Sequence, residues 1–195
     1  MPFTTGILLF DGVEELDFAG PYEVLTIAKK EGDSVVTIAA TADPITGFNG
    51  LKVVPDHGFD DAPALDVLLV PGGMGTRPLA TDATTLDWIK TVAAGCTWVT
   101  SVCTGAILLH AAGLLAGKQC TTHWGYIPTM KEESDVTVLE DVRYVRDGNV
   151  VTAAGVSAGI DMSLWLVGQM YDVQHARDVQ LMIEYNPAPP YAAIV

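Results

Sequence analysis

The chain reads Trp-Val-Thr-Ser-Val-Cys-Thr-Gly-Ala-Ile-Leu-Leu over residues 98–109. An apolar, β-branched run ends at a single cysteine, Cys103, and an apolar run with helical character follows at once. This pattern predicts a buried strand, a sharp turn at Cys103 and a returning helix. Gly105 has no side chain that would block a close approach to the turn. The layout is that of a nucleophile elbow with cysteine in place of serine.

The predicted turn suggests a chemical role for Cys103. A thiol at that position would lie over the N-terminus of the following helix, where unpaired N–H groups and the helix dipole favour negative charge. Both effects lower the pKa of a thiol, so we expect Cys103 to be a nucleophile. The alternative is a buried cysteine that only fills space. That second role is the one we expect for Cys96 and Cys120.

Length and composition indicate one compact globular domain spanning residues 1–195. Hydrophobic residues make up 49% of the chain and charged residues 17%. The net charge of -14 argues against nucleic acid or an anionic membrane surface as a partner. We therefore expect the partner of this protein to be a small-molecule substrate.

The three cysteines are odd in number and form no CxxC pair, so we expect neither a disulfide framework nor a zinc site. The four histidines have no partner at metal-ligand spacing, and we expect no metal and no cofactor. Free thiols fit a reducing cytoplasm. The N-terminus lacks the pattern of a signal peptide, and no apolar run reaches the length of a membrane span.

Strand and helix patterns alternate along the chain. Strands are predicted at 5–10, 34–40, 66–70, 98–102, 118–122, 136–139, 142–146 and 150–153, with a β-hairpin over 44–54. The segment from Glu14 to Gly20 leads into a predicted helix with Pro21 in its first turn. Further helices are predicted at 84–94, after Cys103 up to about Gly113, after Ala154–Gly159, and at 173–184. This order predicts an α/β fold in which a mostly parallel sheet is sandwiched between helices.

In such sheets, ligands bind at the carboxyl ends of the strands. Asp17, Gly72-Gly73, Cys103 and Ala154-Gly155 all follow predicted strands, so the fold could gather them at one edge. Asp17 could be a catalytic acid, or an acid that satisfies N–H groups at a helix start. The two glycines could present N–H groups as an oxyanion hole, and they could also simply make the turn.

Three motifs together resemble the ThiJ/PfpI superfamily, the relatives of class I glutamine amidotransferases. They are Leu69-Val70-Pro71-Gly72-Gly73, Thr100-Ser101-Val102-Cys103-Thr104-Gly105 and Thr121-Thr122-His123-Trp124. The closer resemblance is to its isocyanide hydratase branch, on the Ser-Val-Cys-Thr-Gly elbow and on Leu16-Asp17-Phe18-Ala19-Gly20-Pro21, Ala111-Ala112-Gly113-Leu114-Leu115-Ala116-Gly117-Lys118 and Ala158-Gly159-Ile160-Asp161. The resemblance implies a flavodoxin-like fold and a homodimer.

The resemblance also implies roles for individual residues. Cys103 would attack the isocyanide carbon, Asp17 would perform acid–base work, and Thr104 would donate hydrogen bonds to an oxyanion or the sulfur. His123 is expected to line the pocket; the alternative is a catalytic base, but Asp17 already supplies an acid–base group. Trp124, Val156 and Ile160 are expected to form the other walls of the pocket. Peptidase-like members carry histidine where this chain has Thr104, which argues against protease activity.

Two other functions remain open. A sensor or regulator would bind a small ligand, or undergo oxidation at Cys103, without turnover. The regulators that this chain resembles carry a basic DNA-binding domain, and we expect none before the end at Val195. An enzyme of the glyoxalase type would use the same nucleophile on an aldehyde.

Overall fold

The computed structural model describes residues 2–133 and 135–188, so the end of the chain at Val195 lies outside the described residues. A six-stranded sheet forms the centre of the molecule, in the order β2-β1-β5-β6-β10-β9. Its strands are β1 (Thr4–Leu8), β2 (Ser34–Ile38), β5 (Val67–Val70), β6 (Trp98–Val102), β9 (Tyr144–Asp147) and β10 (Val150–Ala153). All neighbouring pairs are parallel except β9 with β10. The prediction of a mostly parallel sheet is confirmed.

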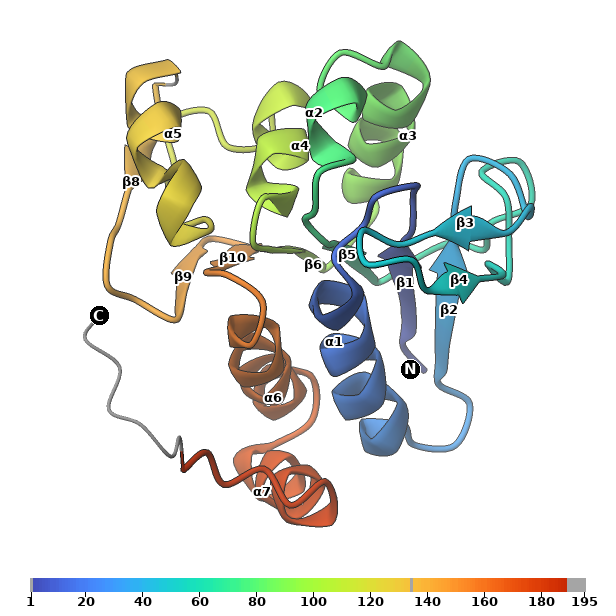
Figure 1. The fold of residues 1–195 in the computed structure, drawn as a ribbon. Coiled ribbons are helices and arrows are strands. Elements are labelled where there is room, and N and C mark those ends of the chain that lie inside the picture. The colour runs from blue at the N-terminus through green and yellow to red at the C-terminus, as the bar shows by residue number, and fades with distance from the viewer. Residues whose placement is uncertain (1, 134, 189–195) are drawn as a thin grey trace.

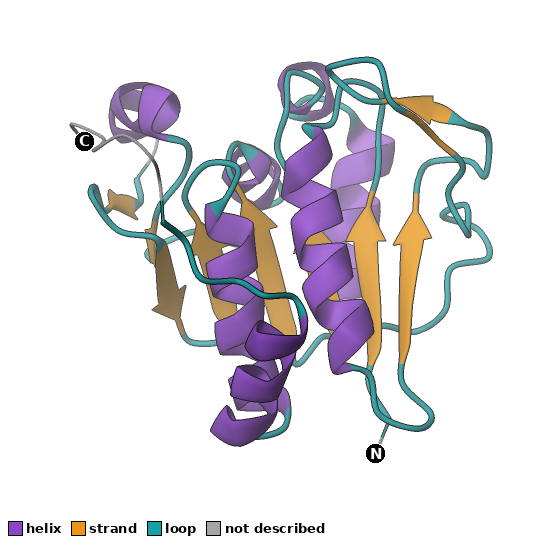
Figure 2. Ribbon diagram, turned by 60° about the horizontal axis from the view of Figure 1, so that its bottom comes forward, coloured by secondary structure: helices purple, strands orange, loops and turns teal. Residues whose placement is uncertain are grey.

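Helices cover both faces of this sheet (Figures 1 and 2). They are α1 (Glu15–Ala28), α2 (Thr76–Leu79), α3 (Ala83–Ala93), α4 (Gly105–Ala111), α5 (Ile127–Glu133), α6 (Ala158–Met170) and α7 (Val173–Met182). Helices α1, α6 and α7 pack together on one face, and α2, α3 and α4 lie on the other (Figure 1). Across the described ranges, every helix is too short or too polar to cross a lipid bilayer.

The central strands are buried on both faces because helices lie above and below them. All four residues of β5 are buried, and so are all four of β10. Because β1, β5, β6 and β10 run in the same direction, their carboxyl ends share one edge of the sheet. The segments that leave these strands, at residues 9–14, 71–75, 103–104 and 154–157, therefore begin next to one another.

Two short sheets lie outside the central one. Strands β3 (Ile45–Thr46) and β4 (Lys52–Val53) form the expected hairpin, although the loop spans residues 47–51 rather than two. Strands β7 (Gln119–Cys120) and β8 (Thr137–Val138) pair in parallel with each other. The strand predicted at 118–122 is therefore shorter than expected and does not belong to the central sheet.

Helix α1 begins earlier than the sequence pattern indicated. Pro21 was expected in its first turn, but the helix starts at Glu15 and Pro21 lies inside it. Pro21 has no N–H to donate to the preceding turn, yet its ring packs against α6: a Cβ built on Gly159 would lie 3.1 Å from Pro21 Cγ. At the residue before Pro21, a Cβ built on Gly20 would lie 2.9 Å from Cγ1 of Ile160. These glycines let α1 and α6 approach closely, which brings the segment before α6 near the start of α1.

Candidate active site

The predicted turn at Cys103 is present between β6 and α4. Cys103 has a backbone φ of 56°, the left-handed region that side chains other than glycine rarely adopt. Its N–H donates to the carbonyls of Ala153 and Ala154, at 3.1 and 3.0 Å, and its carbonyl accepts from the Thr122 hydroxyl at 2.9 Å. Strained backbone persists where its surroundings determine it, and here bonds from two segments hold the turn.

Gly105 has the role that the sequence predicted. A Cβ built on it would lie 2.1 Å from the carbonyl oxygen of Val70, so only glycine lets α4 begin this close to β5. The strand, the turn and the start of the helix thus pack against the end of the neighbouring strand. The thiol of Cys103 is buried there, with 6% of the residue exposed.

Asp17 is completely buried in the first turn of α1, and it reaches away from its own helix. Its Oδ2 accepts the N–H of Gly72 at 2.9 Å, across 55 residues of sequence. Its Oδ1 is buried without a hydrogen-bond partner. Of the two interpretations of Asp17, the structure therefore disfavours an acid that merely caps the helix, because its bond goes to the loop after β5.

The glycine pair after β5 holds this arrangement together, but not as an open oxyanion hole. The N–H of Gly72 donates to Asp17, and the N–H of Gly73 donates to the Thr104 hydroxyl at 3.0 Å. Both donors are therefore occupied in this structure, contrary to the expectation that they point freely toward an oxyanion. A Cβ on Gly72 would lie 2.5 Å from the Thr104 nitrogen and 2.8 Å from Asp17 Oδ2, so this contact requires glycine.

Cys103 and Asp17 lie near enough to change each other's acidity. Burial raises the pKa of Asp17 to about 7, although the Gly72 N–H and the Cys103 thiol oppose the shift. Burial and the Asp17 carboxylate raise the pKa of Cys103 to about 12. The expectation of a lowered thiol pKa is therefore wrong for the resting site. The N–H groups of Thr104 and Val156 do favour the thiolate, but α4 has only seven residues, and burial outweighs these donors.

Val156 completes the surroundings of the pair from the segment before α6. Its backbone N–H lowers the pKa of both Asp17 and Cys103, so this N–H faces the two groups. Val156 has a φ of 45°, a second strained non-glycine residue beside the thiol. Its predicted place near the site is thus supported, through the backbone rather than through an apolar wall.

The remaining predicted wall residues are His123, Trp124 and Ile160. His123 accepts the Gly125 N–H at Nδ1, at 3.2 Å, and its ring covers Gly155, on which a Cβ would lie 2.5 Å from Cδ2. Trp124 is 79% exposed and therefore does not enclose a pocket in this structure. Ile160 packs on Gly20 at the α1–α6 contact.

Arg77 and Thr76, at the start of α2, also contact this site, and the sequence pattern gave them no role. Nη1 of Arg77 is 2.9 Å from the Gly73 carbonyl and 3.3 Å from the Thr104 hydroxyl oxygen. The Thr76 hydroxyl donates to the same carbonyl at 2.8 Å. The only signal in the sequence was a cation five positions after Gly72, in a chain with just ten lysine and arginine residues.

A cavity of about 340 Å³ lies beside this site rather than in it. Leu8, Ile45, Phe59 and Gly75 are among the residues that line it, and Cys103 and Asp17 are not. Gly72 contacts Asp17, whereas Gly75, three residues later, lines the cavity. The short segment between these two glycines thus separates the cavity from the reactive pair.

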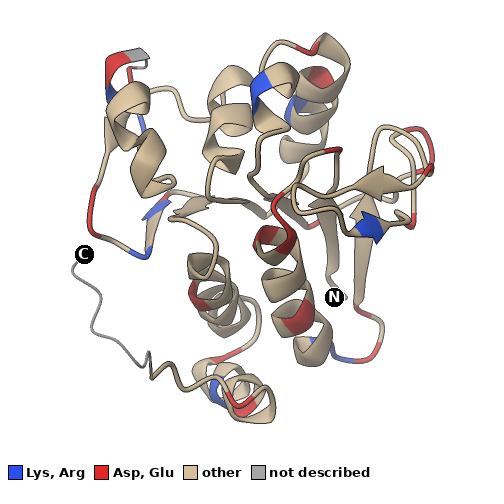
Figure 3. Ribbon diagram, viewed as in Figure 1, with Lys and Arg blue, Asp and Glu red and all other residues tan. Residues whose placement is uncertain are grey.

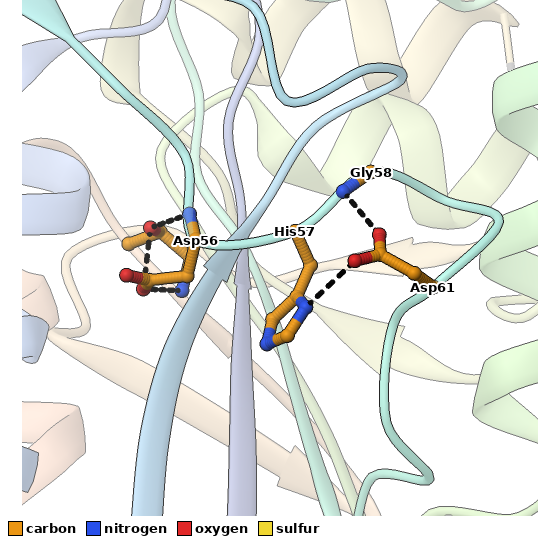
Figure 4. Close-up of polar contacts among 5 residues, drawn as sticks. Asp56, His57, Gly58 and Asp61 are labelled. Carbon is orange, nitrogen blue, oxygen red and sulfur yellow. Dashed lines mark hydrogen bonds and ion pairs between the residues drawn. The ribbon is translucent and has the colours of Figure 1, made fainter.

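The other candidate nucleophiles and bases have local structural roles. Burial raises the pKa of Cys96 and of Cys120 to about 11, and both are buried as expected. His57 is 3.2 Å from Asp61 in the loop after β4, and the N–H of Gly58 donates to the same carboxylate at 2.8 Å (Figure 4). This loop meets the end of the edge strand β2, which is separated from β6 by the two strands β1 and β5. Within residues 2–133 and 135–188, no cluster of three or more His, Cys, Asp or Glu side chains could hold a metal.

Comparison with known proteins identifies relatives over nearly the whole chain. The model of the DJ-1/PfpI family matches residues 5–169. The chain is 45% identical to an isonitrile hydratase of Pseudomonas putida over 98% of this chain and 82% of the relative. It is 29% identical to the HTH-type transcriptional regulator GbdR of Pseudomonas aeruginosa, covering 93% of this chain but only 49% of the regulator.

A solved structure supports the fold. The crystal structure of a ThiJ/PfpI family protein from Pseudomonas syringae is 36% identical to the chain, with a TM-score of 0.93. The superposition covers all of this chain and 80% of that one. The resemblance drawn from the motifs is therefore confirmed at the level of family and fold.

Proposed function

We propose that this chain, which belongs to the DJ-1/PfpI family, adds water to an isocyanide and releases an N-substituted formamide. Its similarity to an isonitrile hydratase over nearly its whole length supports the reaction class, a lyase of the hydratase type. The observation that carries the proposal is the buried pair of Cys103 and Asp17. A thiol beside a carboxyl group with a pKa of about 7 combines a nucleophile with an acid–base group that can act near neutral pH.

In the first half of the proposed reaction, a covalent bond forms at Cys103. The thiol proton moves to the Asp17 carboxylate as the sulfur attacks the terminal isocyanide carbon. Asp17 then returns this proton to the same carbon, which leaves a thioimidate, R–N=CH–S–Cys103. The raised pKa of Asp17 makes it a better proton acceptor than an exposed carboxylate, and its partnerless Oδ1 is available for that proton.

In the second half, water replaces the sulfur. Asp17 accepts a proton from water as the oxygen adds to the thioimidate carbon, and it passes that proton to the nitrogen. The C–S bond then breaks, and the hydroxyl proton returns through Asp17 to the sulfur. The sum is one isocyanide and one water converted to one formamide, with Cys103 and Asp17 regenerated. Dividing the addition into two steps is the usual gain of covalent catalysis.

Incubation with a simple aryl isocyanide tests the proposal, with methylglyoxal as a parallel substrate. We expect formamide to accumulate, measured by liquid chromatography and mass spectrometry, and a quenched reaction to show the mass of the isocyanide added to the Cys103 peptide. Consumption of methylglyoxal without consumption of isocyanide would instead identify a glyoxalase-type enzyme. Turnover without any cysteine adduct would exclude the covalent route.

The similarity to GbdR favours a sensor as the second candidate function. A sensor would bind a small molecule at the Cys103 site without converting it. Calorimetric titration with the isocyanide, followed by product analysis of the same sample, separates the two functions. Saturable binding without formamide would support the sensor.

The homodimer and the cytoplasmic location remain predictions. One region supports self-association: Glu15 accepts the N–H and the side-chain amide of Asn49, both at 2.7 Å, so the hairpin loop lies against the start of α1. Leu16, Phe48 and Leu51 in this region are 41%, 54% and 52% exposed. A second copy could cover these apolar side chains, and light scattering coupled to gel filtration would measure the mass.

A further inference from the structure

Thr122 is a buried residue of the Thr121-Thr122-His123-Trp124 motif, and the proposed reaction gives it no part. It lies just after β7, outside the central sheet, and 0% of the residue is exposed. Its hydroxyl donates to the backbone carbonyl of Cys103 at 2.9 Å, across 19 residues of sequence. A buried hydroxyl thus reaches the nucleophilic residue itself, through the backbone rather than through the thiol.

The backbone of the elbow is held on both sides of Cys103. On the amino side, the Cys103 N–H donates to the carbonyls of Ala153 and Ala154. On the carboxyl side, α4 begins only at Gly105, so the Cys103 carbonyl precedes the hydrogen-bond ladder of the helix. The Thr122 hydroxyl is the donor that the structure gives to this carbonyl. Without that hydroxyl, a buried carbonyl would lose its bond, and the peptide group that follows Cys103 could reorient.

The orientation of this peptide group decides where the N–H of Thr104 points. A peptide bond is planar and trans, so its carbonyl and its N–H point in opposite directions. With the carbonyl directed at Thr122, the Thr104 N–H is directed away from Thr122. A Cβ built on Gly72 would lie 2.5 Å from the Thr104 nitrogen and 2.8 Å from Asp17 Oδ2, so that nitrogen and the carboxylate border the same space.

The Thr104 N–H is a donor that the proposed reaction needs. In a nucleophile elbow, the N–H of the residue after the nucleophile stabilises negative charge that develops beside it. The N–H groups of Gly72 and Gly73 are already occupied. Burial and the Asp17 carboxylate raise the pKa of the Cys103 thiol, and the Thr104 N–H is first among the groups that oppose them. The elbow geometry and the acidity of the thiol thus assign the same N–H to the reacting atoms.

The two segments that meet at this bond carry no charged side chains. Residues 97–117 and 119–130 contain no Lys, Arg, Asp or Glu (Figure 3). They therefore supply no carboxylate, ammonium or guanidinium group to the site. Their contribution to charge stabilisation depends on how their backbone and hydroxyl groups are oriented.

We propose that Thr122 is a positioning residue, which holds the Cys103 carbonyl and thereby directs the Thr104 N–H at the atoms that react beside the thiol. In the proposed reaction, this N–H stabilises the sulfur as a thiolate and then the water oxygen as it adds to the thioimidate carbon. The second of these roles rests on the proposed function, whereas the first can be measured on Cys103 without any isocyanide.

Thr122→Val tests this role, because valine keeps the shape of the side chain and removes the hydroxyl. We expect kcat for isocyanide hydration to fall about 10–100-fold, because an oxyanion donor is misdirected rather than removed, while KM stays within about twofold. Thr122→Ser, which restores a hydroxyl, should recover most of kcat. Steady-state rates with one aryl isocyanide measure these variants, and Thr122→Ala takes the place of the valine variant if the latter does not fold.

The neighbouring Thr121 is the matched control. It is 1% exposed, and its hydroxyl also donates to a backbone carbonyl at 2.9 Å, that of Leu139. Thr121→Val therefore loses the same kind of buried bond one residue away, but its acceptor is not part of the elbow. We expect both valine variants to lower the thermal unfolding midpoint by similar amounts, and only Thr122→Val to lower kcat.

Alkylation of Cys103 by iodoacetamide, followed by peptide mass spectrometry, gives a second readout that needs no isocyanide. Thr122→Val should slow this alkylation about tenfold, since one unit of pKa is a tenfold change in the thiolate fraction. Thr121→Val should react at the wild-type rate. A Thr122→Val variant in which Cys103 and the buried Cys96 both react faster would have a loosened fold, and that result would overturn the proposal.

Equal losses of kcat in Thr121→Val and Thr122→Val would also overturn it, and so would a Thr122→Val variant with the wild-type kcat and the wild-type alkylation rate. A wild-type chain that hydrates no isocyanide would refute the proposed function. Slower Cys103 alkylation in Thr122→Val, but not in Thr121→Val, would in that case still support the positioning role of Thr122.

Discussion

Asp17 lies in the first turn of α1 and Asp33 lies in the loop between α1 and β2, and the two carboxylates have opposite environments. Asp17, in the first turn, accepts one N–H at Oδ2 and has no partner at Oδ1. Asp33, just beyond the last turn, accepts the N–H groups of Phe3 and Lys30, each at 2.7 Å, and the hydroxyl of Tyr171 at 2.5 Å. Of the two carboxylates, only Asp33 is well supplied with donors.

The pKa values follow from this difference. Burial raises the pKa of Asp17 to about 7, and the Gly72 N–H, the Cys103 thiol and the Val156 N–H together do not offset the loss of solvation. Partial burial also raises the pKa of Asp33, but bonds from Tyr171, Phe3 and Lys30 outweigh it, and the net pKa lies below the ordinary value. Ionised Asp33 therefore stabilises the fold, whereas ionised Asp17 costs stability and is kept beside a thiol. Asp33 is thus a structural carboxylate, whereas Asp17 is the carboxylate of the proposed active site.

Removing the nucleophile is expected to have the largest effect on function. Cys103→Ala should abolish isocyanide hydration while the thermal unfolding midpoint changes little, because only a small side chain is lost. Cys96→Ala and Cys120→Ala are the controls and should keep most of the activity. Turnover by Cys103→Ala at a rate near that of the wild type would show that the reactive end of α1 works without a covalent bond.

Asp17→Asn should be the next largest effect. The amide keeps the size of the side chain but cannot shuttle a proton, so the hydration rate should fall by about 10²–10⁴. Asp17→Glu should recover only part of it, because positional errors of about 1 Å can cost on the order of 100-fold. Steady-state rates with one isocyanide measure both variants. A fully active Asp17→Asn variant would contradict the acid–base role of Asp17 and the functional difference between Asp17 and Asp33.

The pH dependence of stability tests the raised pKa of Asp17 directly. Its value of about 7 exceeds the unfolded value of about 4, so its contribution to the free energy of unfolding is complete below pH 4. That contribution is lost as the pH rises through 7, at about 1.4 kcal/mol per unit. Urea unfolding of the wild type and Asp17→Asn between pH 4 and 8 should show the difference shrinking, then changing in favour of the variant, as the pH rises.

Asp33→Asn should show the opposite behaviour. It removes the charge from a carboxylate with three donors, so we expect a loss of about 1–3 kcal/mol in the free energy of unfolding at pH 7 and no change in the hydration rate. Because the folded pKa of Asp33 is lowered, the stabilisation is present above the unfolded pKa and is lost as the pH falls through the folded one. Asp87→Asn, on the exposed side of α3, is the surface control.

The smallest effect is expected for Tyr171→Phe. The variant loses one hydrogen bond to Asp33 but keeps the ring contacts with Phe3 and His175, at centroid distances of 5.7 and 5.0 Å. We expect a cost of about 1 kcal/mol in thermal or urea unfolding, with unchanged activity. A drop in the hydration rate of this variant would mean that the environment of Asp33 is coupled to the site at Asp17.

Local sequence patterns predict much of the fold. The run before Cys103, the turn and the glycine at 105 identified β6, the elbow and α4, because apolar periodicity and backbone freedom act over a few residues. The same holds for the β9–β10 hairpin at Asp147-Gly148, where Gly148 has a φ of 64°. Pro21 was placed wrongly because its ring packs on α6, a contact between residues more than a hundred positions apart.

The candidate site divides in the same way. Cys103, Asp17, Gly72 and Thr104 could be named from the sequence because each follows or precedes a strand end, and parallel strands bring their ends to one edge. The sequence by itself thus determined the fold class and singled out Cys103 and Asp17 as the pair proposed to react. The acidity of that pair, the occupied N–H groups of the glycines, the exposure of Trp124 and the contacts of Arg77 were decided only by the tertiary structure. Burial and hydrogen-bond supply depend on which distant segments pack against a group, and no local pattern carries that information.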